Sequence, residues 1–219
     1  MTKRVALKWE ELPEAVAKYS PEVVFFDLDD TLYDAEKCYS QALNNIGLDG
    51  ENSGFQRARE LVKQRLPGNT SARNRLLYFK CFIEQQTSER FSASAVLDLM
   101  HRYEAALILA IKEDWNSRRQ RIEKVLEFFR TRYRLGLITN ENVRTQLLKL
   151  SVIDPSGKFF NSVLVSEEVG YEKPHPFIFQ VACERLKTIP SRAVMIGDNL
   201  IADIEGAEGF GMETCWLEL

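Results

Sequence analysis

Five short apolar segments occur along the chain, each rich in Val, Ile, Phe or Leu. Their apolar positions are continuous rather than alternating, which is typical of strands covered on both faces in a parallel sheet. They are VVFF at 23–26, LGLI at 135–138, SVLV at 162–165, AVMI at 193–196 and TCWL at 214–217. Helical segments separate the last four, at Thr145–Leu150, Phe177–Leu186 and around Asp203–Gly206. This alternation predicts an α/β fold, a doubly wound parallel sheet with right-handed crossovers.

The interval between the first two apolar segments breaks this alternation, because nearly all of it has the periodicity of helices. Apolar positions at helical spacing occur at Tyr39–Ile46, Phe55–Leu66, Leu76–Ile83 and Val96–Ile111. A further helix is predicted at Arg118–Tyr133, leading back to the sheet. We therefore expect a core domain formed by residues 1–33 and 116–219, with a helical insertion at residues 34–115.

The composition is that of a globular protein and excludes several classes of partner. The 219 residues include 29 basic and 32 acidic side chains, a balance that argues against binding to nucleic acid or to membrane surfaces. The apolar stretch Ala105–Ile111 is too short to span a bilayer, and the N-terminus has no signal-like apolar core, so we expect a cytoplasmic protein. The four cysteines form no CxxC pair, which favours reduced thiols over a zinc site.

Polar side chains follow four of the apolar segments, at the point where each strand is expected to end. They are Asp27 and Asp29 after the first, Thr139 and Asn140 after the second, Lys173 beyond the third, and Asp198 and Asp203 after the fourth. In open parallel sheets these ends meet at one edge, so the four carboxylates are expected to converge. Carboxylates that close resist ionisation unless a cation lies among them, and an all-oxygen ligand set favours Mg²⁺.

The motifs that carry these residues resemble the four motifs of the haloacid dehalogenase (HAD) superfamily. They are DLDDT at 27–31, LITN at 137–140, EKP at 172–174 and GDNLIAD at 197–203, and they occur in the order that the family uses. The resemblance extends from Val23 to the C-terminus and is to the phosphatase-type branch with a helical (C1-type) cap. It implies a Rossmann-like core and identifies the helical insertion as the cap.

The resemblance implies a division of labour among the acids. Asp27 would attack phosphorus and become an aspartyl-phosphate, while Asp29 would protonate the leaving oxygen and then deprotonate water. Mg²⁺ would be held by the carboxylates of Asp27 and Asp198 and by the backbone carbonyl of Asp29. Asp203 would be an outer acid that orients the metal's waters or the lysine.

The resemblance also implies how the phosphate is bound. Thr139 and the backbone amide of Asn140 would bind its oxygens, and Lys173 would neutralise the charge that spreads over them during transfer. Thr31 would shape the loop by hydrogen bonding.

The expected function is Mg²⁺-dependent hydrolysis of a small-metabolite phosphate monoester, of the nucleotide or sugar phosphate type. A phosphate-shuttling mutase and a haloacid dehalogenase are alternatives on the same fold, although a dehalogenase has little use for an acid at Asp29. A catalytically silent binding or regulatory module is a third alternative. The sequence leaves both the identity of the substrate and the oligomeric state open.

Several other polar or aromatic residues are interpreted as structural. Asp30 is expected to point away from its neighbours, Asp34 to cap the first insertion helix, and His175 to belong to a turn. The three tryptophans are interpreted as packing residues; they are Trp9, Trp115 and Trp216.

The segment from Arg57 to Lys80 contains seven basic residues and one acid, Glu60. Exposed helical Lys and Arg are usually a solvated surface, which is one interpretation of this segment. The other is that it attracts anions or binds a second acidic group of the substrate, in which case Arg73 and Arg75 are the expected contacts.

Overall fold

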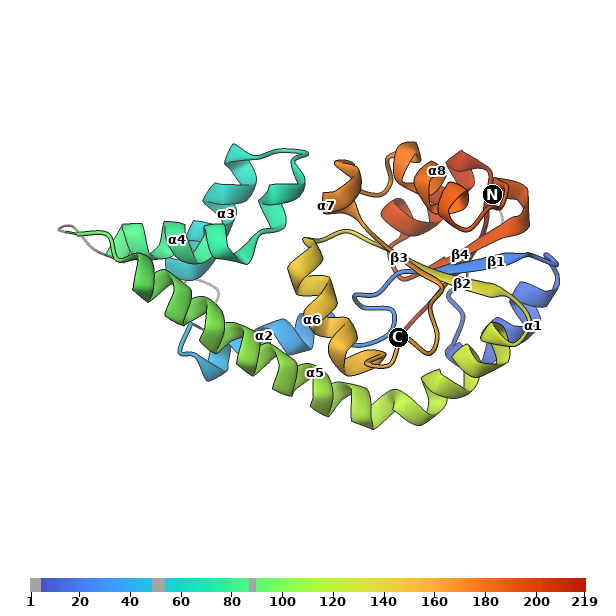
Figure 1. Cartoon of the computed structure of the whole chain (residues 1–219), viewed down its shortest axis with the longest axis horizontal. Coiled ribbons are helices and arrows are strands. Elements are labelled where there is room, and N and C mark those ends of the chain that lie inside the picture. Colours follow the sequence, from blue (N-terminus) through green and yellow to red (C-terminus); the bar gives the residue numbers. More distant parts are fainter. Residues whose placement is uncertain (1–4, 49–53, 87–89) are drawn as a thin grey trace.

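Within residues 5–48, 54–86 and 90–219, which the computed structural model describes, five parallel strands form one central sheet (Figure 1). The strands are β1 (Val23–Phe26), β2 (Arg134–Thr139), β3 (Ser162–Val165), β4 (Ala193–Gly197) and β5 (Glu213–Trp216). Their order across the sheet is β3-β2-β1-β4-β5, so β1 lies in the middle. Each predicted apolar segment is a strand, and the predicted α/β fold is confirmed.

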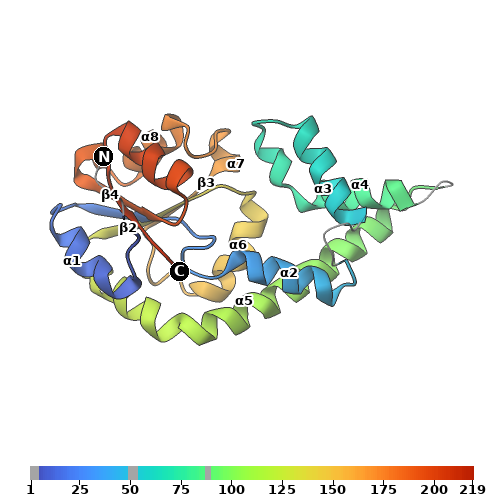
Figure 2. The ribbon, with the colours of Figure 1, turned by 180° about the vertical axis from the view of Figure 1, so that it is seen from behind.

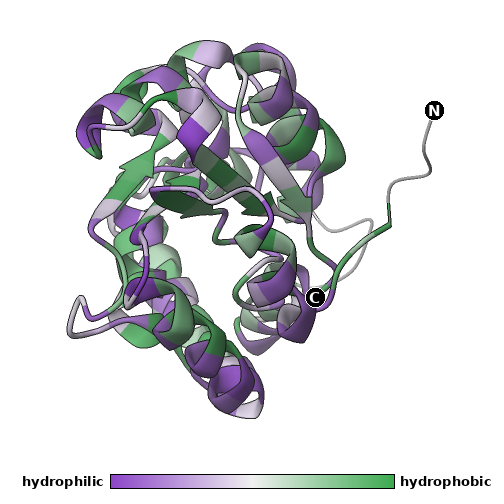
Figure 3. Cartoon of the chain, turned by 90° about the vertical axis from the view of Figure 1, so that its right-hand side faces the viewer, coloured by the Kyte–Doolittle hydropathy of each residue, from purple (hydrophilic) through white to green (hydrophobic). Residues whose placement is uncertain are grey.

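Helices cover both faces of the sheet because its strands are apolar on both sides. Val24 and Phe26 of β1 belong to one apolar cluster, while Val23 and Phe25 belong to another on the opposite face. The first face packs against α1 (Leu12–Ala17), α5 (Ala93–Arg130) and α6 (Val143–Ile153), and the second against α8 (Pro176–Arg185) and α9 (Gly206–Phe210). Figure 3 shows the strands as the green, hydrophobic centre between helices with purple outer sides.

Short helical turns complete the core. They are the 3₁₀ segments η1 (Trp9–Glu11) and η3 (Pro190–Arg192), the one-turn helix α7 (Ser166–Val169) and the π-helical segment η4 (Leu200–Glu205). In the described part of the chain, no helix has the length and apolarity that crossing a membrane requires.

The chain between β1 and β2 is helical, as predicted. After α2 (Ala35–Asn45) it forms α3 (Gly54–Arg65), the 3₁₀ turn η2 (Thr70–Arg73) and α4 (Arg75–Gln86). Rings pack these elements together: the centroids of Phe55 and Phe79 are 5.1 Å apart, and Phe79 lies 5.5 Å from Tyr103 of α5. Figure 2 shows α3 and α4 standing beyond the carboxyl edge of the sheet, joined to the core along α2 and α5.

The two helices expected at Val96–Ile111 and Arg118–Tyr133 are one continuous helix, so that prediction of a break was wrong. The intervening polar residues remain helical because tertiary contacts satisfy them. Asp114 is buried, accepts a hydrogen bond from the backbone amide of Asp34 at 3.1 Å, and pairs with Arg118 at 2.9 Å. The predicted division at residues 115/116 lies inside α5, and it stays a prediction.

Candidate active site

The carboxyl edge of the sheet holds a polar cavity of about 230 Å³, which we call the carboxylate pocket. It forms where β1, β2 and β4 end, because parallel strands bring their following loops to one edge. Seven of the residues singled out in the sequence line it together: Asp27, Asp29, Thr139, Asn140, Lys173, Asp198 and Asp203. Thr31 stands behind them, and its hydroxyl donates to Asp198 Oδ1 at 3.1 Å.

Lys173 is the central cation of this pocket. Its side chain is 2% exposed, and Nζ donates to Oδ1 of Asp27 and Oδ1 of Asp203, at 2.6 Å each. Burial acts to lower the pKa of Lys173, but the carboxylates of Asp203 and Asp27 outweigh it and raise that pKa. The ammonium form of Lys173 is therefore favoured beside the Asp27 carboxylate.

Asn140 positions Lys173 through its side chain. Its Nδ2 donates to the Lys173 carbonyl at 2.9 Å, and its Oδ1 accepts from the Lys173 amide at 2.7 Å. The prediction for Asn140 concerned its backbone amide, so this side-chain contact is an additional role. Thr139 Oγ1 accepts a hydrogen bond from Gln146 Nε2 at 2.5 Å, which leaves its hydroxyl hydrogen available to a ligand in the pocket.

The pocket concentrates negative charge at a point that suits a divalent cation. One ligand oxygen from each of Asp27, Asp198 and Asp203 lies within 4.8 Å of the others. Burial raises the pKa of Asp27; Lys173 acts to lower it, but burial, with Asp203 and Asp29 adding to it, prevails. Burial and then Asp203 raise the pKa of Asp198 to about 6. Carboxylates that resist ionisation together and offer only oxygen are the donor set that Mg²⁺ fits.

Asp203 is already engaged on both oxygens. Besides the contact with Lys173, its Oδ2 accepts from the backbone amide of Asn199 at 3.1 Å. Asp198 is anchored from behind, because the indole of Trp216 donates to its carbonyl at 2.8 Å. Asp27 and Asp198 are therefore the carboxylates best placed to hold a cation, with Asp203 supporting Lys173.

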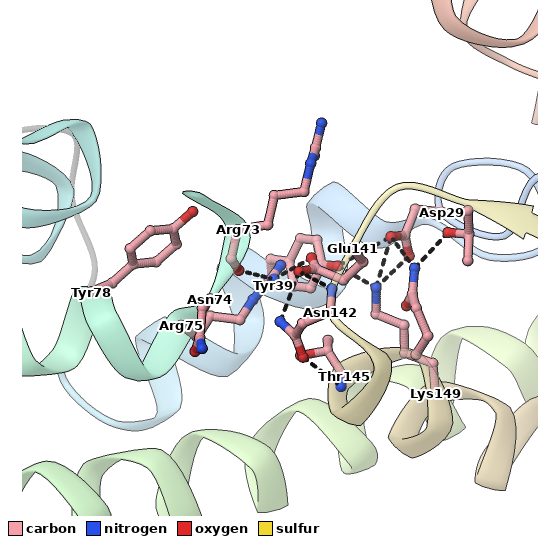
Figure 4. Close-up of polar contacts among 12 residues, drawn as sticks. Asp29, Tyr39, Arg73, Asn74, Arg75, Tyr78, Glu141, Asn142, Thr145 and Lys149 are labelled. Atoms are coloured by element: carbon pink, nitrogen blue, oxygen red, sulfur yellow. Dashed lines mark hydrogen bonds and ion pairs between the residues drawn. The ribbon is translucent and has the colours of Figure 1, made fainter. Parts of the chain in front are cut away.

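Asp29 lies in a network that the sequence did not reveal. Lys149 of α6 is fully buried, and its Nζ lies 2.7 Å from both carboxylate oxygens of Asp29. Tyr33 donates to Asp29 at 2.5 Å, and Gln146 and Tyr39 lie 3.3 and 3.4 Å from its carboxylate. Figure 4 shows the side chain of Lys149 directed toward Asp29. Burial acts to raise the pKa of Asp29, but Lys149 and then Tyr33 reverse this and lower it.

Residues 21–211 match the haloacid dehalogenase-like hydrolase family. The chain belongs to this family. A ribulose-1,5-bisphosphate 5-phosphatase of Halopiger xanaduensis is 32% identical to it over 202 residues, which cover 87% of this chain and 82% of that protein. A glyceraldehyde 3-phosphate phosphatase of Pyrococcus furiosus is 30% identical over 205 residues, which cover 90% of this chain and 80% of that protein. Together, the family and these relatives identify a phosphoric monoester hydrolase.

Solved structures share the fold of this HAD hydrolase. A 2-haloacid dehalogenase from Pseudomonas syringae superposes with a TM-score of 0.65 at 24% identity, covering 90% of this chain and 86% of that one. A HAD phosphatase from Thermococcus onnurineus gives a TM-score of 0.54 at 24% identity, with coverage of 89% and 85%. At these identities the comparison supports the fold alone.

The residues that we interpreted as structural have structural contacts in this HAD hydrolase. Asp30 adopts a left-handed φ of 55° and its Oδ1 accepts from the Ala35 amide at 2.8 Å, so it helps to begin α2. Asp34 is the N-cap of α2, and His175 is the N-cap of α8. Trp216 contributes more than the expected packing, through its hydrogen bond to Asp198.

A second cavity, of about 340 Å³, adjoins the carboxylate pocket on the side of the insertion helices. We call it the insertion cavity. Asp29, Asp30 and Arg73 line both, so the two spaces share a wall. The remaining lining comes mainly from α2, α3 and α4, and includes Tyr39, Phe55, Arg59, Lys63, Arg75, Tyr78 and Glu141. The HAD core therefore opens from its acidic centre into a space bordered by the insertion.

Two arginines of the basic segment join the insertion to the core. Nε and Nη2 of Arg73 donate to the carboxylate of Glu172 at 2.7 and 3.0 Å, one residue before Lys173. Arg75 pairs with buried Glu141, one residue after Asn140, and its guanidinium lies 4.5 Å from the ring centroid of Tyr39. Figure 4 shows Arg75 turned toward Tyr39 and Glu141 while the side chain of Arg73 points away from them.

Proposed function

We propose that this hydrolase is a Mg²⁺-dependent phosphatase that cleaves a small-metabolite phosphate monoester, of the nucleotide or sugar phosphate type, through an aspartyl-phosphate on Asp27. The observation that carries the proposal is the Asp27 carboxylate, 2.6 Å from the Lys173 ammonium and within 4.8 Å of ligand oxygens of Asp198 and Asp203. The names of the relatives in Halopiger and Pyrococcus, both phosphatases of small phosphorylated compounds, support it.

The nucleophilic step uses groups that already face one another. An oxygen of Asp27 would attack phosphorus, forming the Asp27–phosphorus bond as the bond to the leaving oxygen breaks. Thr139, the amide of Asn140 and Lys173 would hold the other phosphate oxygens while negative charge builds up on them. Water would then attack the phosphoryl group and release phosphate from Asp27.

Mg²⁺ would be held by the carboxylates of Asp27 and Asp198 and by the backbone carbonyl of Asp29. When bound, it would neutralise the repulsion between an anionic nucleophile and an anionic phosphate. Asp203 would keep Lys173 in place, consistent with the 2.6 Å contact between them.

Asp29 would serve as acid in the first half of the reaction and as base in the second. The lowered pKa of Asp29, caused by Lys149 against the effect of burial, favours the ionised form and so the second half. Protonation of the leaving oxygen requires a proton on Asp29. This proton would take the position of one of the contacts that the Lys149 ammonium makes with the Asp29 carboxylate at 2.7 Å. Lys149 is therefore proposed as a positioning residue for Asp29. The insertion would act as the cap over both groups.

A panel of phosphorylated metabolites, assayed for phosphate release with and without Mg²⁺, tests the proposal. Metal-dependent release by the natural chain, lost in Asp27→Asn, is the expected result. Release that persists in Asp27→Asn would remove Asp27 as the nucleophile. A lack of turnover across the whole panel, with Mg²⁺ bound, would instead favour a silent module.

A further inference from the structure

The insertion cavity has an uneven distribution of charge. Its basic residues come from the insertion: Arg59 and Lys63 from α3, Arg73 from η2 and Arg75 from α4. Of its acidic residues, Asp29, Asp30 and Glu141 belong to the core edge, and Glu36 comes from α2. The basic residues therefore lie on the side of α3, η2 and α4, and the acids on the side of the core and α2.

Two of these four cations are already neutralised by the protein. Arg75 is paired with Glu141, and Arg73 with Glu172. Arg59 and Lys63, by contrast, form no ion pair or hydrogen bond with any residue in the described part of the chain. They lie four residues apart on α3, so their side chains share one face of that helix.

The cations also repel one another. Partial burial and then the charges of Arg59, Arg73 and Arg75 lower the pKa of Lys63, with Glu141 acting in the opposite direction. Such a cluster is unfavourable without a counter-charge, and a bound anion would relieve the repulsion.

The position of this cluster relates it to the reaction site. The insertion cavity and the carboxylate pocket share Asp29, Asp30 and Arg73. A phosphate bound at Asp27 would therefore leave the rest of its molecule pointing past Arg73 into the insertion cavity. The far end of that molecule would meet α3, where Arg59 and Lys63 lie.

We propose that Arg59 and Lys63 bind a second anionic group, a phosphate or carboxylate, carried by the substrate on the part that leaves as an alcohol. The proposal rests on the proposed phosphatase function, since that function defines which end of the substrate enters the carboxylate pocket. It differs from the expectation from sequence, which placed this contact on Arg73 and Arg75. Those two arginines are held by Glu172 and Glu141 instead.

Three matched substrates test it: a linear alkyl phosphate, the same chain ending in a carboxylate, and the same chain ending in a second phosphate. We expect the natural protein to prefer at least one doubly anionic compound over the alkyl phosphate, as measured by kcat/KM. In the double variant Arg59→Ala/Lys63→Ala this preference should fall about tenfold, mainly through KM, as for the loss of charged hydrogen bonds. The two anionic compounds distinguish phosphate from carboxylate recognition.

Arg65→Ala is the matched control, because Arg65 lies on the same helix, is exposed, and does not line the cavity. It removes positive charge from α3 without touching the proposed contact, so the preference should persist. An equal loss of preference in Arg65→Ala would show that the overall positive charge of α3 attracts the anion, and would overturn the proposed contact. A natural protein with no preference, or a preference that survives in Arg59→Ala/Lys63→Ala, would also overturn it.

Binding separates this proposal from the phosphatase proposal. Calorimetry with Asp27→Asn measures the affinity for the same three compounds without turnover. Suppose that the natural protein hydrolyses none of the three compounds, but that Asp27→Asn binds the doubly anionic ones more tightly and loses this advantage when Arg59 and Lys63 are also replaced. The anion site would then stand, and the phosphatase function would fail. If the natural protein hydrolyses the compounds but Asp27→Asn binds all three with equal affinity, the phosphatase function stands and the anion site fails.

Discussion

The carboxylate pocket and the insertion cavity share a wall, yet their charges are balanced in different ways. In the pocket, Lys173 contacts two carboxylates at 2.6 Å and Lys149 contacts Asp29 at 2.7 Å, and both lysines are buried. In the cavity, Arg59 and Lys63 are exposed and carry no ion-pair partner within the described chain. Buried charges require partners from the protein itself, whereas exposed ones can be balanced by a ligand. We infer that the core determines the reaction and that the insertion selects the leaving group.

Replacing Asp27 should give the largest effect, because it removes the bond-forming atom from the pocket. In Asp27→Asn we expect kcat to fall at least about a thousandfold, as for other lost nucleophiles. Phosphate release under saturating substrate measures this. Asp98→Asn, an exposed change on α5, is the control and should retain full kcat. Turnover within tenfold of the natural protein in Asp27→Asn would break the assignment of chemistry to the core.

The pocket residues could be predicted from sequence because they follow strands in sequence motifs. Asp27, Lys173 and Asp198 each come shortly after an apolar run or within a short motif, and sheet topology brings such loops together. Lys149 could not be predicted from sequence, because its partner Asp29 is 120 positions away and their contact depends on how α6 packs. The one local signal was a lysine inside the apolar run QLLKLSVI, where burial demands a counter-charge.

The strands were more predictable than the helices for a related reason. A continuous apolar run shows from its own residues that the strand is buried on both faces, as VVFF does for β1. The segment Lys112–Ser117 looks like an exposed break, yet no Gly or Pro interrupts it and Trp115 is buried. Part of what satisfies its buried polar residue is non-local, since Asp114 accepts from the amide of Asp34, 80 positions away.

The pair of Lys149 and Asp29 offers the next largest effect, this time on stability. Lys149→Met leaves the Asp29 carboxylate without its counter-charge, and we expect the free energy of unfolding to fall by about 3 kcal/mol. Adding Asp29→Asn should recover part of this loss, because the unpaired charge is then gone. Urea denaturation of the two single variants and the double variant measures the coupling.

The pH dependence of this loss gives a second readout. With Lys149 present, the lowered pKa of Asp29 stabilises the fold above the ordinary aspartate pKa of about 3.9, and this is lost as pH falls through the folded value. Without Lys149, burial should raise the Asp29 pKa, so the penalty should shrink as the pH falls toward 3.9. A penalty that is constant with pH would point to lost packing instead.

Mg²⁺ should stabilise the pocket by a moderate amount. Because the pKa of Asp198 is raised to about 6, ionisation between about pH 4 and 6 destabilises the metal-free fold, and a bound cation offsets this. At a hundredfold excess over Kd we expect Tm to rise by about 5–10 °C at neutral pH and by less at pH 4. Differential scanning calorimetry measures it, and Asp198→Asn should lose the shift while Asp98→Asn keeps it. Equal shifts in both variants would place the cation elsewhere.

Arg73 gives the smallest expected effect and defines the boundary between the two regions, since it lines both. Its ion pair with Glu172 is half exposed, with side chains 39% and 24% accessible, so it is worth at most about 1 kcal/mol. We expect Arg73→Ala to raise KM about two- to fivefold at low salt, and less at high salt, with little change in kcat. If Arg73 acts by holding the loop before Lys173, Glu172→Gln should reproduce this change and the double variant should add nothing. A larger effect of Arg73→Ala that persists in the double variant would show that Arg73 contacts the substrate itself. Arg73 would then act in recognition of the substrate, together with the insertion cavity, rather than in support of the carboxylate pocket.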